Sequence, residues 1–100
     1  MSLFAVSFVL EDGADYADRY KALTEAIEIQ ADGEVWSDTT SFSLLTSTKN
    51  SVGLKASILE MANLQKGDTL LIINISQTRR HAAEGIPNKA LFTRLMSQRQ

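Results

Sequence analysis

Apolar and smaller residues alternate at the start of the chain, and this alternation predicts a β-strand. Across residues 3–10 the larger apolar side chains fall at every second position, at Phe4, Val6, Phe8 and Leu10. A pleated strand has this period of two, because successive side chains point to opposite faces. A turn signal at residues 11–13 ends the run. We therefore expect a strand that is buried on at least one face.

The next segments predict a helix and then a hairpin. Apolar side chains recur in steps of four, three and four at Tyr16, Tyr20, Leu23 and Ile27, and such steps stack along one side of an α-helix. Asp12 or Asp15 can cap its first turn. Two short runs at 34–38 and 41–48 follow, joined by a polar turn, as in a β-hairpin.

The second half of the chain continues a second strand-helix-strand unit, which repeats the order of the first. Asn50 suits a helix cap, and helical spacing continues through Leu54, Ile58 and Met61 to a breaker at 66–68. Residues 69–75 are almost continuously apolar, which is typical of a central strand covered on both faces. Beyond residue 76 the sequence predicts a loop and then a short helix at 90–96, with Pro87 in its first turn.

This order of elements predicts an α+β fold, the ferredoxin-like plait (βαββαβ). Sequential strands tend to be neighbours and parallel crossovers are right-handed, so the expected sheet has four antiparallel strands with both long helices on one face. Residues 1–76 would form this domain, and residues 77–100 would form a C-terminal loop and short helix.

Two helices on one face leave the other face of such a sheet uncovered. Leu3, Ala5 and Val9 lie opposite the large apolar set of the first strand, and the last strand is apolar on both sides. We therefore expect a homodimer in which two sheets pack face to face across a twofold axis. The alternative is that the C-terminal tail folds back over this face.

Composition limits the function classes. The chain has 100 residues and no cysteine, which excludes disulfides and thiolate metal sites. No stretch is long and apolar enough to cross a membrane, and the start lacks a cleavable signal pattern, so a cytoplasmic location without membrane contact is expected. No phosphate-cradling glycine loop or nucleophile elbow is present.

Charge is divided between the two halves of the chain. Residues 1–48 contain nine acidic and two basic side chains, whereas residues 49–100 contain three acidic and eight basic ones. Arginine and lysine gain affinity for nucleic acid by releasing counterions from phosphates, and the candidate nucleic-acid-binding residues are Lys49, Lys55, Arg79, Arg80 and Arg94. The alternative is an ordinary solvated surface or a site for an acidic partner, which a sequence pI of about 5.3 favours.

Two further residues are candidates for nucleic-acid chemistry. His81 follows two arginines and could carry a proton beside bound phosphate, as a metal-free nuclease requires, although a lone histidine in a polar loop is more often simply exposed. Trp36 is the aromatic residue best placed for stacking on a base.

Several short motifs resemble a known family. They are residues 4–10 (FAVSFVL), the Asp15-Tyr16 pair, residues 35–37 (VWS), residues 41–45 (SFSLL) and residues 67–72 (GDTLLI). Together they resemble the CRISPR-associated Cas-two adaptation proteins and, more closely, their SinR-like relatives. The resemblance implies a homodimeric ferredoxin-like fold, association with nucleic acid and, in some members, metal-dependent nuclease activity.

The resemblance also implies where such activity would reside. In the family an aspartate at the end of the first strand of each subunit holds a divalent cation at the dimer axis. Val9 occupies the matching position, and an isopropyl group offers magnesium no oxygen ligand. The expected function is therefore a non-catalytic, cofactor-free homodimer that binds a protein or nucleic-acid partner. The alternative is a magnesium-dependent endonuclease on RNA or DNA, in which Glu11 and Asp12 hold the metal and a bound water attacks.

Overall fold

The computed structural model describes residues 2–39, 41–76 and 81–96. The helices and strands follow one another as β1 (Ser2–Val9), α1 (Tyr16–Gln30), β2 (Val35–Trp36), β3 (Phe42–Ser47), α2 (Ser51–Met61), β4 (Thr69–Asn74), β5 (His81–Glu84) and α3 (Lys89–Met96). The predicted α+β class is confirmed, since three helices accompany one antiparallel sheet.

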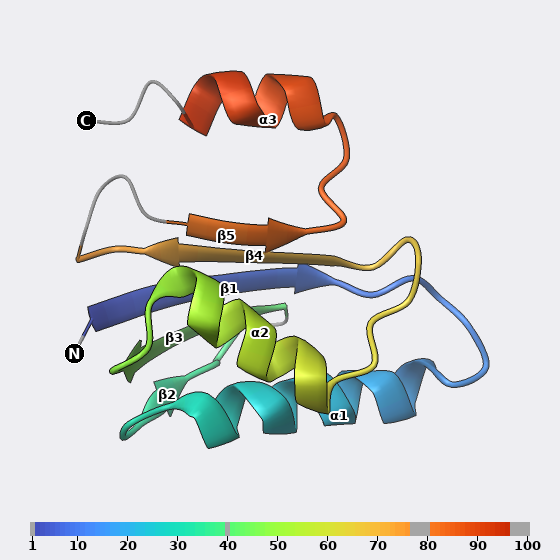
Figure 1. Ribbon diagram of the computed structural model, residues 1–100. Helices are drawn as coiled ribbons and strands as arrows, with labels where there is room; N and C mark the ends of the chain where they lie inside the picture. The colour runs from blue at the N-terminus through green and yellow to red at the C-terminus, as the bar shows by residue number, and fades with distance from the viewer. Residues whose placement is uncertain (1, 40, 77–80, 97–100) are drawn as a thin grey trace.

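The sheet has five strands in the order β2-β3-β1-β4-β5 (Figure 1). The predicted number of four was wrong, because residues 81–84 pair with β4 in a segment that we expected to be a loop. The sequence of β5, two alanines between a histidine and a glutamate, has no β-branched or aromatic residue and no apolar alternation. Its pairing with β4 makes it a strand. The predicted short helix is present as α3, but it begins at Lys89, so Pro87 precedes it and is not in its first turn.

The hydrophobic core lies between one face of the sheet and the two long helices, α1 and α2. Even-numbered residues of β1, namely Phe4, Val6 and Phe8, are at most 2 % exposed. They join a single cluster with residues from α1 and α2, including Leu23, Ala26, Ile27, Leu54 and Ile58. The alternation seen in the sequence therefore orients β1 as predicted.

The helices differ from expectation at two points. Met61 is 45 % exposed, whereas Ala62 is buried, because a step of four from Ile58 continues the buried side of the helix. Asn50 caps α2 as predicted, accepting a hydrogen bond from the Gly53 amide at 2.7 Å. Asp15 is at the N-cap of α1 but caps no amide with its side chain, which binds Arg19 instead.

Gly85 permits the close approach of β5 to the start of β4, and replacing it with alanine is expected to destabilise the fold. Its φ is +70°, and a Cβ atom there would overlap the backbone carbonyl of Asp68. The left-handed conformation alone costs an alanine about 1–2 kcal/mol, and the overlap adds to this. Thermal unfolding should give a clearly lower melting temperature for Gly85→Ala than for the wild type. Gly13→Ala is the control, since the φ of Gly13 is not positive. Equal melting temperatures would contradict this expectation.

Candidate interaction surface

The face of the sheet opposite α1 and α2 is largely apolar, and no helix of the described ranges covers it (Figure 1). Odd-numbered residues of β1, β4 and β5 point to this face, together with Trp36 of β2 and even-numbered residues of β3, as the cross-strand pairs require. One row of paired residues crosses the whole sheet and consists of Trp36, Leu44, Ala5, Ile73 and His81. We call this surface the open face.

Large apolar side chains on the open face are exposed to solvent. Val9 is 61 % exposed, Trp36 44 %, Leu3 37 % and Ile75, directly after β4, 48 %. Trp36 also makes an edge-to-face contact with Phe42, with ring centroids 6.2 Å apart. Among the described residues the strands present no acidic side chain and no lysine or arginine on this face. Such a surface disfavours contact with water and favours an apolar partner.

The described part of the C-terminal segment does not cover the open face. Figure 1 shows α3 alongside β5, at the edge of the sheet, and it does not cross β1 or β3. The predicted alternative, in which the tail folds back over this face, is therefore not seen in residues 81–96. Leu3, Ala5 and Val9, which we predicted to form an interface, all lie on the open face, with Ala5 half-buried.

Of the basic residues predicted to bind nucleic acid, the three that the structure describes lie on different elements. Lys49 is exposed in the turn between β3 and α2, and Arg94 is exposed on α3. Lys55 is half-buried and forms an ion pair with Glu84 at 3.7 Å, which offsets its charge. Arg79 and Arg80 lie outside the described residues.

Within one chain the structure separates His81 from Glu11 and Asp12, the other two alternative catalytic residues. His81 pairs with Ile73, whose other neighbour is Ala5. Glu11 follows Ala5 by six residues, which corresponds to about 20 Å along the strand direction. No group of three histidine, aspartate or glutamate residues suited to a metal ion is found in the described ranges.

Glu11 is held in place by its neighbours. Its amide donates to Asp68 Oδ1 at 2.7 Å, and its carbonyl accepts a hydrogen bond from Arg19. Its carboxylate lies against Gly67, where a Cβ atom would overlap it. The chain therefore fixes Glu11 beside the α2–β4 turn. Val9, and not Glu11, is the residue that the end of β1 presents on the open face.

A buried carboxylate, Asp68, organises this junction. Its side chain is fully buried and accepts hydrogen bonds from the amides of Glu11 and Gln65 at 2.7 and 2.8 Å and from Arg19 Nη1 at 2.8 Å. The Arg19 side chain is only 9 % exposed, and its Nε also binds Asp15 at 3.2 Å. We did not identify this network from the sequence. Asp68 is 49 residues from Arg19, so no helical or strand spacing relates them.

The hydrogen bonds to Asp68 determine its acidity. Burial alone would raise the pKa of this carboxyl, but the amides of Gln65 and Glu11 and the Arg19 guanidinium stabilise the anion more strongly. The pKa of Asp68 in the folded protein is therefore lower than its usual value of 3.8. The ionised Asp68 side chain therefore stabilises the folded protein fully at pH values at which Asp68 is also ionised in the unfolded chain.

The free energy of unfolding is accordingly expected to fall as the pH drops below about 4. The sign follows from the lowered pKa: the contribution of Asp68 is complete above its unfolded-state pKa and is lost as the pH falls through the folded-state pKa. Urea unfolding of the wild type and of Asp68→Asn at a series of pH values measures the contribution of Asp68 to the free energy of unfolding. The difference between the two proteins should shrink in acid, and a constant difference would contradict the assignment.

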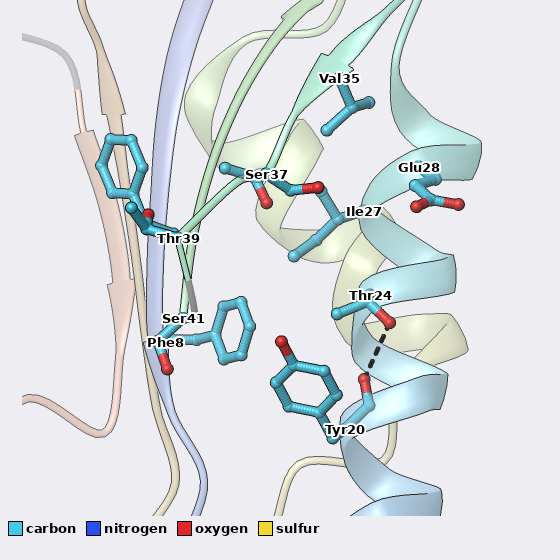
Figure 2. A pocket seen from close by; sticks show the side chains of 11 residues that line it. Phe8, Tyr20, Thr24, Ile27, Glu28, Val35, Ser37, Thr39 and Ser41 are labelled. Atoms are coloured by element: carbon cyan, nitrogen blue, oxygen red, sulfur yellow. Dashed lines mark hydrogen bonds between the residues drawn. The ribbon is translucent and has the colours of Figure 1, made fainter.

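A small cavity lies between α1 and the β2–β3 hairpin. Figure 2 shows Tyr20, Thr24 and Ile27 of α1 on one side of it, with Phe8 of β1 and Ser37, Thr39 and Ser41 of the hairpin on the other. Its volume is about 50 Å³, which is room for about one or two water molecules. Pockets for organic ligands are much larger, about 300–1,000 Å³. The cavity is therefore not a substrate site.

No helix in the described ranges has the length and apolar character needed to cross a membrane. Comparison with known proteins found no family model, no curated protein and no solved structure that matches this chain.

Proposed function

We propose that this protein is a small homodimeric interaction module without catalytic activity, and that its two copies associate through the open faces of their sheets. The observation behind the proposal is the uncharged apolar surface formed by the odd-numbered residues of β1 and β4, on which Val9 is 61 % exposed and Leu3 37 %. A second copy offers the same apolar surface, and a twofold axis brings like patches together.

The size of the open face limits how much area a dimer can bury. The strands β2, β3, β1, β4 and β5 contain 2, 6, 8, 6 and 4 residues, so at about 3.3 Å per residue and about 4.8 Å between strands the face spans about 400 Å² per copy, or about 800 Å² in total, which is at the small end of the range for protein interfaces. The absence of lysine, arginine and acidic side chains from this face among the described residues favours such a dry contact.

We further propose that the first four strands, with α1 and α2, form a ferredoxin-like plait of the Cas-two-like and SinR-like kind, to which β5 is an addition. The strand order β2-β3-β1-β4 supports this proposal. The proposal includes no catalysis because Val9 supplies no metal ligand at the end of β1, and because Glu11 lies beyond β1, with its backbone hydrogen-bonded to Asp68 and Arg19 and its carboxylate against Gly67. Nucleic-acid binding has less support, since Lys55 is already paired with Glu84.

The oligomeric state tests the proposal directly. One chain has a mass of 11.0 kDa, so light scattering at micromolar concentration should give about 22 kDa for a twofold dimer. A mass near that of one chain at these concentrations would exclude the dimer. Cleavage of RNA or DNA that requires magnesium or manganese and stops with chelator would exclude the non-catalytic part of the proposal.

A further inference from the structure

The outer edge of β5 is not paired with another strand in the described residues. The Phe8 N–H donates to the Ser41 carbonyl, and the Ile75 N–H donates to the Leu3 carbonyl. The backbone groups of even-numbered residues of β1 therefore form hydrogen bonds with β3, and those of odd-numbered residues of β4 form hydrogen bonds with β1. Even residues of β4 therefore face β5.

The register then fixes which groups of β5 face outward. Leu70 pairs with Glu84, and Ile72 pairs with Ala82, so Ala82 and Glu84 complete the bonds to β4. Ala83 lies between them and directs its N–H and C=O away from the sheet. These two groups are hydrogen-bonding positions for an incoming strand.

A groove runs along this edge, between β5 and α3. Figure 1 shows α3 running beside β5 on the side away from β4. The groove has a volume of about 460 Å³ and is lined by His81, Ala83, Glu84, Gly85, Ile86, Lys89 and Thr93. This volume lies in the range of sites that bind ligands, about 300–1,000 Å³.

A second groove borders the C-terminal end of β5, on the side of the sheet that α2 covers. Its volume is about 480 Å³, and it is lined by Leu59 and Leu64, by Lys66 and by Glu84 and Gly85. Successive side chains of a strand point to opposite faces. A strand added to β5 would therefore direct alternate side chains toward the two grooves.

The charge at the grooves indicates the kind of strand that fits. Glu84 is paired with Lys55 at 3.7 Å, whereas Lys66 and Lys89 have no ion pair with any residue that the structure describes. Both lysines are exposed. The net charge presented to a ligand is therefore positive and complements acidic side chains.

We propose that the edge of β5 binds an extended, acidic peptide segment of a partner protein, which adds to the sheet as a sixth strand. Backbone hydrogen bonds to Ala83 supply affinity, and the alternate side chains meet Lys89 in one groove and Lys66 in the other. This inference does not rest on the proposed dimer, because among the described residues of a single chain no strand pairs with the outer edge of β5.

Fluorescence anisotropy with a labelled peptide of alternating valine and glutamate tests the inference. The wild-type protein should bind it with micromolar affinity. Lys89→Glu should weaken binding about tenfold through the lost charge, and Lys21→Glu is the matched control, since Lys21 is an exposed lysine on α1. Ala83→Pro, which removes the outward N–H and none of the hydrogen bonds to β4, should also weaken binding.

Changes to the peptide keep the test independent of protein stability. Methylation of alternate peptide amides should abolish binding, since these are the groups that bond to an edge strand, and lysine in place of glutamate should weaken it. Undetectable binding to the wild type, or binding that is indifferent to both peptide changes and to Lys89→Glu, would overturn the inference. Loss of dimer mass in Ala83→Pro would also overturn it, because the edge would then pair two copies.

Discussion

Replacing Val9 with aspartate is expected to convert the proposed dimer to a monomer. Val9 is 61 % exposed in the single chain, so the carboxylate remains hydrated there and the fold is unaffected. In a face-to-face dimer the same carboxylate enters an interface without a lysine or arginine from the described strands to pair with it. Burying an unpaired charge costs several kcal/mol, so the dissociation constant should rise about 100-fold or more.

Val52→Asp provides the matched control for this experiment. Val52 is 64 % exposed but lies on α2, away from the open face. Light scattering across a dilution series should show a dimer for wild type and Val52→Asp and a monomer for Val9→Asp. Chelator belongs in every sample, because two aspartates facing each other across a twofold axis could hold a divalent cation. A Val9→Asp protein that stays dimeric in chelator would place the interface elsewhere.

Asp68→Asn is expected to be the most destabilising conservative substitution in the protein. Both carboxylate oxygens accept hydrogen bonds, Oδ1 from Glu11 and Oδ2 from Gln65 and Arg19. An amide supplies one oxygen and one NH₂ group, so in either orientation a donor faces a donor. The substitution also leaves Arg19 without its buried partner. Breaking a buried charged pair typically costs about 3–5 kcal/mol.

Thermal unfolding should show this loss as a decrease in melting temperature of about 20 °C or more for a chain of this size. Asp12→Asn is the control, since Asp12 is exposed and makes no hydrogen bond or ion pair with the described residues. The control should melt within about 2 °C of the wild type. A similar, small change in both variants would show that Asp68 does not hold the junction together.

Local patterns were sufficient to predict the central strands and long helices. The period-two alternation in β1 correctly separates Phe4, Val6 and Phe8 from Leu3 and Val9, and helical spacing locates Leu23 and Ile27 in the core. These elements carry their own periodicity because each buries one side. β5 carries none, since its four residues are small or polar, and only its pairing with β4 makes it a strand.

The candidate surfaces were predictable to different degrees. The open face follows from β1 and β4, because most of their odd-numbered residues are apolar and none of these lies in the helix-covered core. The groove beside β5 could not be predicted, because it depends on a strand that the sequence does not reveal. The Asp68–Arg19 pair was also missed, since it depends on how the β1–α1 and α2–β4 connections meet in space.

The alternation in β1 also determines which changes in chain length the protein can tolerate. Inserting a single residue after Ala5 would shift every later side chain of β1 to the opposite side, moving Phe8 into solvent and Val9 into the space beneath the helices. Inserting two residues restores the orientation and displaces only the pairing. Length variation within β1 should therefore be restricted to even numbers, whereas the turn between β1 and α1 is subject to no such parity rule.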